Sequence, residues 1–235
     1  IPFFFVSELL SALLLIKKYR ISLIHAHWIL PQGLIAAIAK KLFGVPYIVT
    51  AHAGDIFPLK SKCLKFLAKF ALENADFCTA NSAYTLNSVR GISKIRNIDA
   101  IPMGVDMAIF ARRKKNAKKE LGIKGKMILS AGRLAEKKGI IYLIMAMPKV
   151  LRKFPDSKLV IVGDGSEKPF LIKKAKELGI QNSIIFAGNI KNQKLPDYYS
   201  SADIFAGPSI ITKSGDTEGL SVVFQTFCHR LLCKQ

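Results

Sequence analysis

Short apolar runs rich in β-branched residues alternate along this chain with longer segments of helical period. Because two parallel strands need a long crossover connection, usually a helix, this alternation predicts βαβ units and a parallel sheet with helices on both faces. The fold class is therefore α/β. The predicted strands are 22–25, 47–50, 77–80, 98–101, 127–131, 159–162, 184–187 and 204–206, and the predicted helices are 33–42, 62–73, 84–89, 139–153, 168–178 and 195–200.

The predicted strands form two sets of four, separated by a strongly basic stretch. Residues 112–125 hold seven basic residues, one acid and two glycines in place of the apolar pattern. Such a shift in composition is typical of a domain boundary, because linkers are exposed and polar. We therefore predict an N-terminal domain over 1–110, a basic linker over 111–125 and a C-terminal domain over 126–235.

Composition limits the class of protein and its compartment. Half of the 235 residues are hydrophobic, which is enough to bury a sizeable core and excludes a disordered chain. The four cysteines form no C-x-x-C pair, which fits a reduced intracellular compartment and gives no readable zinc site.

The N-terminal run 1–16 is almost entirely apolar. As a helix it would be about 24 Å long, short of the roughly 30 Å of a hydrocarbon core. Lys17, Lys18 and Arg20 follow the run, whereas the positive charges of a signal peptide precede its apolar part. We therefore expect a buried or interfacial helix in a cytoplasmic protein.

The chain carries 36 Lys and Arg against 16 Asp and Glu, a net charge of +20. Acidic partners are therefore expected, and nucleic acid, anionic lipid and phosphorylated small molecules all qualify. The basic stretch 112–119 has no aromatic residues among its charges, which argues against a nucleic-acid interface. We expect no nucleic-acid partner, and we retain peripheral contact with an anionic membrane.

The first candidate binding motif lies where the fifth predicted strand ends and the next helix begins. Ligands of open α/β sheets bind at the carboxyl ends of the strands. At that place Gly132 permits a tight turn, while Arg133 supplies a bidentate fork and Lys138 a point charge, which together suit a diphosphate. An ordinary basic surface loop is the alternative for this motif taken alone.

Two further motifs follow later strands. Gly163 and Gly188 come at the ends of two successive strands, where glycines let a flat ring approach the backbone. Glu218 precedes a helix expected to begin near residue 220, so its carboxylate can accept hydrogen bonds from sugar hydroxyls beside the free N–H groups of a helix start. Taken alone, each motif is an ordinary turn into a helix.

In their order along the chain these motifs resemble retaining glycosyltransferases of family 4. The resemblance covers about residues 20–224 and implies the GT-B fold, in which two Rossmann-like domains with parallel sheets face each other. Both domains would be incomplete here. The matching motifs are H-A-H-W at 25–28, T-A-H-A-G-D at 50–55, P-M-G-V-D at 102–106, G-R-L-A-E-K-K-G at 132–139, V-G-D-G at 162–165, F-A-G-N-I at 186–190, A-D-I-F-A-G-P-S at 202–209 and E-G-L at 218–220.

The resemblance implies a role for each matching residue. His52 would lie beside the reacting sugar. The activity implied is transfer of a sugar, with retention, from a nucleotide-diphosphate sugar to a glycan or lipid-linked acceptor, without a metal or other cofactor. The implied donor-binding residues are Arg133 and Lys138 for the diphosphate, Glu218 with the amides of Leu220, Ser221 and Val222 for the sugar and phosphate, and the backbone near Gly163 and Ile190 for the nucleobase.

The chain departs from the family at both ends. The family has a second Glu eight positions after the equivalent of Glu218, and Thr226 stands there in this sequence. Residues 225–235 do not resemble the family's helix, so we expect a frameshift or chain break near residue 225. The family's opening strand and its last strands are also missing. We therefore expect a fragment truncated at both ends, weakly active or inactive by itself.

Three other functions fit parts of the sequence. A sugar-nucleotide epimerase can use the same GT-B scaffold, and a nucleic-acid binder would explain the net charge. A metal hydrolase is the third, because His25 and His27 share one face of a predicted strand, with His52 and Asp55 nearby.

Overall fold

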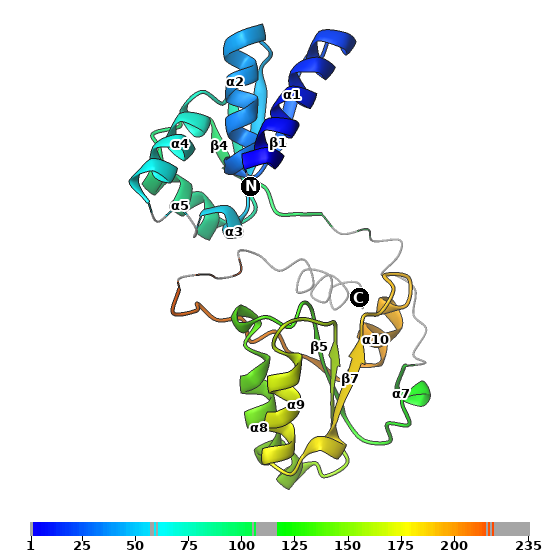
Figure 1. The fold of residues 1–235 in the computed structure, drawn as a ribbon. Helices are drawn as coiled ribbons and strands as arrows, with labels where there is room; N and C mark the ends of the chain where they lie inside the picture. Colours follow the sequence, from blue (N-terminus) through cyan, green and yellow to red (C-terminus); the bar gives the residue numbers. More distant parts are fainter. Residues whose placement is uncertain are drawn as a thin grey trace. The chain divides into compact units, whose positions relative to one another are not determined.

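A computed structural model of the chain describes residues 2–56, 59, 61–104, 106, 117–214, 216 and 218 (Figure 1). The chain divides into two compact units, Ile1–Met103 with Gly215–Leu220, and Gly104–Ser214 with Ser221–Gln235. Each unit contains one parallel sheet of four strands connected by helices. The predicted α/β fold class is confirmed.

The strands of the first unit lie side by side in chain order, β1-β2-β3-β4. All three pairings are parallel, so the carboxyl ends of the strands share one edge of the sheet. The register places His25 opposite Ile48 and His27 opposite Thr50. The strands are β1 (Ile24–His27), β2 (Tyr47–Ala51), β3 (Phe77–Ala80) and β4 (Ile98–Ala100).

Local sequence explains where the helices of this unit begin and end. The side chains of Ser61 and Ser82 accept hydrogen bonds from the backbone N–H groups of Leu64 and Thr85, as N-caps do. Gly44 ends its helix in the left-handed conformation, with φ 70°. The elements are α1 (Pro2–Tyr19), the helical turn η1 (Ile29–Gly33), α2 (Leu34–Phe43), α3 (Ala53–Ile56), α4 (Lys62–Glu73) and α5 (Ala83–Ile92).

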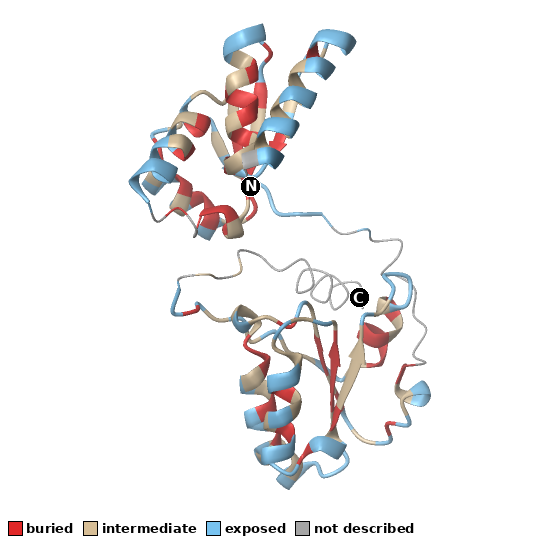
Figure 2. Ribbon diagram, in the orientation of Figure 1, coloured by how far each residue is buried: buried red, intermediate tan, exposed pale blue. Residues whose placement is uncertain are grey.

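Alternate residues of β2 form the centre of the first core. Tyr47, Val49 and Ala51 are fully buried, and α2, α4 and α5 pack on the face of the sheet that they share (Figure 2). Alternation along a strand sends the residues between them, including Thr50, to the opposite face. The facing helical residues are mostly alanines, which allow close approach: Ala36, Ala37, Ala68 and Ala71.

Helix α1 packs on the unit through only part of its length. Ile16 is buried against Ala39 and Val45, whereas Phe3, Phe4 and other large apolar side chains of the helix are exposed. The described part of the chain contains no helix whose length and hydropathy would let it cross a membrane.

The second sheet has the order β7-β6-β5-β8, so the chain proceeds from β5 to one side and later returns to the other side of β5. All of its pairings are parallel. The direction of winding therefore reverses between β5 and β8, and crevices at such switch points bind the ligands of open α/β sheets. The strands are β5 (Met127–Ala131), β6 (Lys158–Val162), β7 (Ile184–Gly188) and β8 (Ile204–Phe205).

Helices cover both faces of the second sheet, as predicted. Leu159 and Ile161 belong to a core cluster with α8 and α9, whereas Val160 and Val162 pack with Tyr198 and other residues on the opposite face. The helical elements are α7 (Ala117–Glu120), the short turn η2 (Glu136–Lys138), α8 (Ile140–Lys153), α9 (Lys168–Glu177), the short turn η3 (Gln181–Ser183) and α10 (Leu195–Ser201).

The basic stretch predicted as a linker is partly structured. Ala117 of α7 is buried, and its backbone N–H donates to Oγ of Ser201 at 3.1 Å. Ile123 is also buried in the second unit. Residues 117–125 therefore pack as part of this unit, because apolar positions are interspersed among the lysines. Residues 111–116 lie outside the described part.

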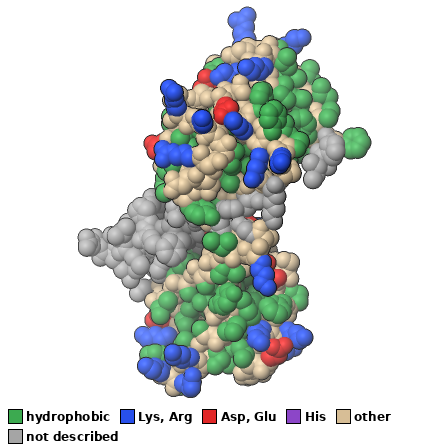
Figure 3. Space-filling model, turned by 90° about the vertical axis from the view of Figure 1, so that its left-hand side faces the viewer, with side chains coloured by type: hydrophobic (Ala, Val, Ile, Leu, Met, Phe, Trp, Pro, Cys, Tyr) green, Lys and Arg blue, Asp and Glu red, His purple; other side chains and the backbone are tan. Residues whose placement is uncertain are grey.

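All eight predicted strands and all six predicted helices overlap observed elements. The largest offset is at α5, which extends to Ile92 rather than ending at residue 89, and β1 extends to His27 rather than ending at His25. Lys and Arg side chains are spread over the surfaces of both units, with fewer Asp and Glu among them (Figure 3).

Candidate functional site

The carboxyl edge of the second sheet is built from glycines held by backbone hydrogen bonds. The N–H of Gly132, which follows β5, donates to Val162 O at 2.9 Å, and the N–H of Gly163, which follows β6, donates to Gly188 O at 2.7 Å. Gly132 and Gly163 have φ of 141° and 121°, which L side chains rarely adopt. The loops after β5, β6 and β7 are thus joined by backbone hydrogen bonds along this edge.

Two cationic residues flank the end of β5. The ammonium nitrogen of Lys138 lies 3.5 Å from the point where Gly132 would carry a Cβ, so the lysine lies over this glycine. Arg133 follows Gly132 directly and is exposed. Lys138 thus lies within ordinary van der Waals distance of a Cβ at position 132, and it is the positive φ of this residue that favours glycine. The two predicted diphosphate ligands therefore belong to one turn at the switch point.

Helix α8 begins at the same place. Gly139 precedes it with φ 62°, and a Cβ on this residue would overlap the carbonyl oxygen of Pro208, which follows β8. The Ile210 N–H also donates to Lys137 O at 2.9 Å. The start of α8 is thereby held between the chain segments that follow β5 and β8. Its free N–H groups add positive potential beside Arg133 and Lys138.

The loop after β6 is closed by Asp164. Its carboxylate accepts a hydrogen bond from Gly165 N–H at 2.8 Å and forms an ion pair with Lys168 at 2.7 Å. The hydrogen bond from Lys168, followed by that from Gly165, lowers the pKa of this carboxyl. Because α9 begins only at Lys168, Asp164 shapes the turn that precedes this helix.

The predicted nucleobase positions lie on neighbouring strand ends. Gly163 follows β6, and Ile190 follows β7, where it packs half-buried against the core around Val162. Of the predicted sugar-binding residues, Glu218 is half-buried and is grouped with the first unit. Three more predicted site residues lie outside the described part of the chain: Leu220, Ser221 and Val222.

The first unit holds a cluster of polar side chains on one face of its sheet. Nε2 of His25 lies 2.7 Å from Oγ1 of Thr50, and that oxygen lies 2.7 Å from Oγ1 of Thr79. At the carboxyl end of β1, Nδ1 of His27 lies 3.2 Å from Nε2 of His52. His52 thus follows the end of β2 and is paired with His27.

Burial and the neighbouring His27 lower the pKa of both His25 and His52. Desolvation lowers the pKa of His52, and the charge that His27 can carry lowers it further. The same two causes lower the pKa of His25. Since the ordinary histidine pKa of 6.5 is already below neutrality, both rings are uncharged at pH 7.

Asp55 connects the loop that carries His52 to the loop after β1 through a hydrogen bond. Its Oδ2 accepts a hydrogen bond from Ile29 N–H at 2.8 Å, and its side chain is almost fully buried. Among the described atoms, Oδ1 has no hydrogen-bond partner. Desolvation raises the pKa of Asp55 to about 6, although backbone N–H groups oppose the shift.

Replacing Asp55 with asparagine should stabilise the first unit at neutral pH. The pKa of Asp55 rises from its ordinary value of 3.8 to about 6, so the folded state holds the proton more tightly than the unfolded state. The free energy of unfolding should therefore fall as pH rises from about 4 to about 6, by up to roughly 3 kcal/mol. Asp55→Asn should remove this fall, since the amide oxygen can still accept from Ile29.

Urea unfolding at several pH values, followed by the fluorescence of Trp28, measures this effect. Asp76→Asn is the control with the opposite sign, because the hydrogen bond from Lys40 lowers the pKa of Asp76. The stability that Asp76 contributes is present above its unfolded pKa and is lost as pH falls through the folded value. An Asp55→Asn chain less stable than wild type at pH 7 would contradict the account of Asp55.

The predicted alternative of a metal hydrolase lacks its ligand set. Within the described residues, no three His, Cys, Asp or Glu side chains form a group that could hold a metal ion. The Asp55 carboxylate is directed to the backbone of Ile29, while His25 and His27 bond to Thr50 and His52. The side chains of His25 and His27 on this strand face are therefore engaged in hydrogen bonds.

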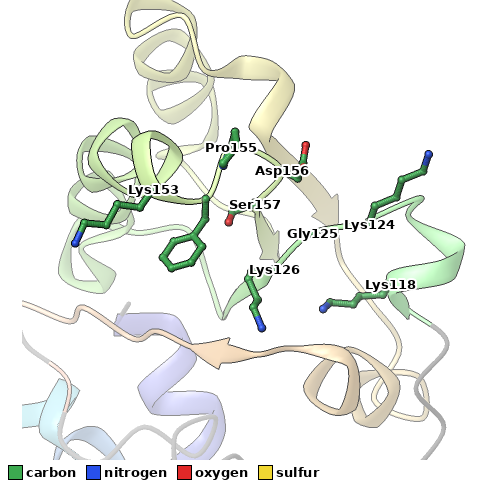
Figure 4. Close-up of a pocket in the computed structure, with 9 residues that line it drawn as sticks. Lys118, Lys124, Gly125, Lys126, Lys153, Pro155, Asp156 and Ser157 are labelled. Carbon is green, nitrogen blue, oxygen red and sulfur yellow. The ribbon is translucent and has the colours of Figure 1, made fainter.

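A basic hollow of about 340 Å³ lies at the opposite, amino end of the second sheet. Figure 4 shows that the ammonium groups of Lys153 and Lys124 point to opposite sides of it. Lys118 is paired with Asp203 at 2.6 Å. Because these cations diverge or are already neutralised, the hollow does not offer one phosphate several charges.

The sequence did not predict three contributions to these sites. They are the pairing of His27 with His52, the burial of Asp55 and the contact of Gly139 with Pro208. The H-x-H pattern indicates one strand face, but the partner of His27 depends on the register between β1 and β2. The contact between Gly139 and Pro208 joins distant parts of the sequence and leaves no local signal.

Two family models match consecutive parts of the chain. The model of Glycosyltransferase Family 4 matches residues 2–109, and the model of glycosyl transferases group 1 matches residues 111–225.

Several curated proteins are similar to this chain. An uncharacterized glycosyltransferase of Methanocaldococcus jannaschii is 28% identical over 218 residues, which cover 85% of this chain and 54% of that protein. The alpha-monoglucosyldiacylglycerol synthase of Streptococcus pneumoniae is 27% identical over 90% of this chain and 51% of its own length. A GDP-mannose-dependent monoacylated alpha-(1-6)-phosphatidylinositol monomannoside mannosyltransferase of Corynebacterium glutamicum is 30% identical over 83% and 52%. The chain therefore spans about half the length of these relatives.

Solved structures share the fold. Sucrose-phosphate synthase from Thermosynechococcus elongatus aligns with a TM-score of 0.79 and 22% identity, over 93% of this chain and 56% of that one. HepE of Anabaena in complex with UDP-glucose aligns with a TM-score of 0.77 and 20% identity, over 93% and 60%. At these identities the likeness concerns the fold, which is GT-B.

Proposed function

From the premise that this chain belongs to a GT-B glycosyltransferase family, we propose that the whole protein transfers a sugar from a nucleotide-diphosphate sugar to an acceptor, with retention of configuration. The observation that carries the proposal is the turn after β5. Lys138 lies over Gly132, Arg133 is its direct neighbour and α8 begins there, all at the switch point of the second sheet.

The proposed mechanism stabilises the leaving group electrostatically. As the bond between the sugar and the diphosphate breaks, negative charge grows on the phosphate oxygens. Arg133 would bind two of these oxygens with its planar fork, and Lys138 would approach them as a point charge. Fixed cations beside the start of α8 need little reorganisation at the moment of reaction. Arg133, Lys138 and the start of α8 would stabilise this negative charge in place of a metal ion.

Other residues would hold the rest of the donor. The backbone at Gly163, which is hydrogen-bonded to Gly188, and the backbone near Ile190 would face the nucleobase. Glu218 would accept hydrogen bonds from sugar hydroxyls, with the amides of residues 220–222 beside the phosphate. His52 is neutral, so it can exchange hydrogen bonds with a sugar hydroxyl without placing a cation beside a developing oxocarbenium centre.

The donor class has support from the comparisons. One solved neighbour was crystallised with UDP and with UDP-glucose, and several curated relatives are named as GDP-mannose-dependent. We therefore propose a nucleoside-diphosphate sugar as donor for the whole protein.

For the acceptor we propose a glycan or a lipid-linked molecule at an anionic membrane surface. Two relatives are named for phosphatidylinositol mannosides and for diacylglycerol. Helix α1 exposes apolar side chains such as Phe3 and Leu14, and Lys17 and Lys18 stand in its last turn. An exposed apolar surface with adjacent cations is suited to an anionic interface.

We further propose that the 235-residue chain alone is weakly active. It spans 51–54% of the three relatives described above, so elements of a complete GT-B enzyme would be missing.

The proposed activity predicts a defined product pattern. The whole protein should release a nucleoside diphosphate from one of a panel of UDP-, GDP- and ADP-sugars, slowly with water and faster with the correct acceptor. NMR of the product should show the anomeric configuration of the donor. Conversion of the donor into an epimer without an acceptor would instead identify the epimerase, and no consumption of any donor would contradict the proposal.

A further inference from the structure

His27 and His52 are joined by a direct hydrogen bond at the edge of the first sheet. Nδ1 of His27 lies 3.2 Å from Nε2 of His52, and the two rings are stacked with centroids 5.5 Å apart and an angle of 26° between their planes. In such a bond one ring supplies an N–H and the other a lone pair. The bond engages Nε2 of His52, and Nδ1 is the other ring nitrogen that can donate or accept a hydrogen bond.

The pairing follows from the register of the sheet. His25 lies opposite Ile48, yet its Nε2 bonds to Thr50, two residues further along β2. His27 lies opposite Thr50 and bonds to His52, which is again two residues further along. The same diagonal relation occurs twice on one face, so the backbone itself brings the two rings together.

The backbone on both sides of the pair is held in place. Directly after His27, the Trp28 N–H donates to Thr50 O at 2.9 Å, and the Ile29 N–H donates to Asp55 at 2.8 Å. Asp55 lies in α3, directly after the turn that carries His52, and is only 4% exposed. The loop after β1 and the loop after β2 are therefore fastened to each other, so His27 offers His52 a fixed partner.

We infer that His27 is a positioning residue, which fixes the ring orientation and the tautomer of His52 so that Nδ1 of His52 faces the reacting sugar. The inference rests on the proposed role of His52 in the transfer reaction. His27 itself acts through His52, and a neutral imidazole in one tautomer presents either a donor or an acceptor at Nδ1, never both.

Within the described part of the chain, the ionisable groups near His52 include His27 on β1, with His25 beyond it, and Asp55 on α3. Burial lowers the pKa of His52 and the charge that His27 can carry lowers it further, so loss of His27 should raise this pKa.

Imidazole ¹⁵N NMR on the 235-residue chain tests the inference without any assay of transfer. In wild type, His52 should be a single neutral tautomer. In His27→Phe, which keeps a stacked ring but removes the hydrogen bond, His52 should become a mixture of tautomers and its pKa should rise. His27→Asn, which keeps a polar group near Nδ1, should restore one tautomer. His25→Phe is the matched control on the same strand face and should leave the His52 tautomer unchanged.

Kinetics of the whole protein separate this inference from the proposed function. His27→Phe should lower kcat by about 10- to 100-fold and change KM for the donor little. It should also shift the acid limb of the pH profile to higher pH. An unaltered His52 tautomer in His27→Phe overturns the inference, whatever the activity. If the tautomer depends on His27 but His52→Ala transfers sugar at the wild-type rate, the pairing stands and the proposed role of His52 fails.

Discussion

Replacing Arg133 or Lys138 with alanine should lower the turnover of the nucleotide sugar by about two to three orders of magnitude in the whole protein. Removal of one fixed donor from a site where charge develops typically has this effect. Both residues belong to the turn after β5, where Lys138 lies over Gly132 and α8 begins. The charge on the leaving diphosphate would then lack a partner in the transition state.

Two variants separate a specific effect from a loss of charge. Lys174→Ala removes one positive charge from α9, where Lys174 pairs with Glu177 at 3.1 Å, and should leave turnover nearly unchanged. Arg133→Lys keeps the charge but loses the planar fork, so its turnover should lie between those of wild type and Arg133→Ala. Turnover near the wild-type value in either alanine variant would show that these residues do not clamp the diphosphate.

Alanine at Gly139 or Gly163 should strongly destabilise the second unit. Both glycines have positive φ, 62° and 121°, which costs an L-residue about 1–3 kcal/mol. Their new Cβ atoms would also overlap backbone oxygens, that of Pro208 for Gly139 and that of Gly132 for Gly163. Relief of such overlaps typically costs about 1–3 kcal/mol more. The total is a large part of the stability of a domain of this size.

Gly179→Ala isolates the effect of the contact. Gly179 has φ 67°, close to that of Gly139, but a Cβ there would meet no heavy atom within 4 Å. Urea unfolding should therefore show a loss of only about 1–2 kcal/mol in Gly179→Ala, against about 2–5 kcal/mol in Gly139→Ala. Equal losses of unfolding free energy in the two variants would mean that the backbone of Pro208 does not lie in close contact with residue 139.

The arrangement of elements could be predicted from the sequence because hydrophobic periodicity reports burial directly. The run Tyr47–Ala51 is almost wholly apolar, as is typical of a strand in a parallel sheet, and its residues Tyr47, Val49 and Ala51 are buried on one face. The glycines after β5 and β6 also stand where strands end, so Gly132 and Gly163 indicated the edge that a ligand approaches. Arg133 and Lys138 were predicted together because they lie in one short turn.

The contacts between strands could not be predicted, since they depend on register and on distant segments. His27 and His52 meet only because β1 pairs with β2 in the observed register. The burial of Asp55 depends on α3, a helix of four residues that is too short for a periodic signal. Part of the predicted basic linker packs in the second unit, and this too depends on a distant segment. The backbone N–H of Ala117 donates a hydrogen bond to Ser201, which lies far along the chain.

The central claim is that the carboxyl edge of the second sheet binds a diphosphate through Arg133 and Lys138. Isothermal titration of the 235-residue chain with uridine, guanosine and adenosine diphosphates, and with the matching nucleosides, measures this directly. One diphosphate should bind at least about 100-fold more tightly than its nucleoside, a difference of about 2.8 kcal/mol, and Arg133→Ala or Lys138→Ala should remove most of that difference. Equal affinities for diphosphate and nucleoside, or a difference that survives both substitutions, would contradict the claim.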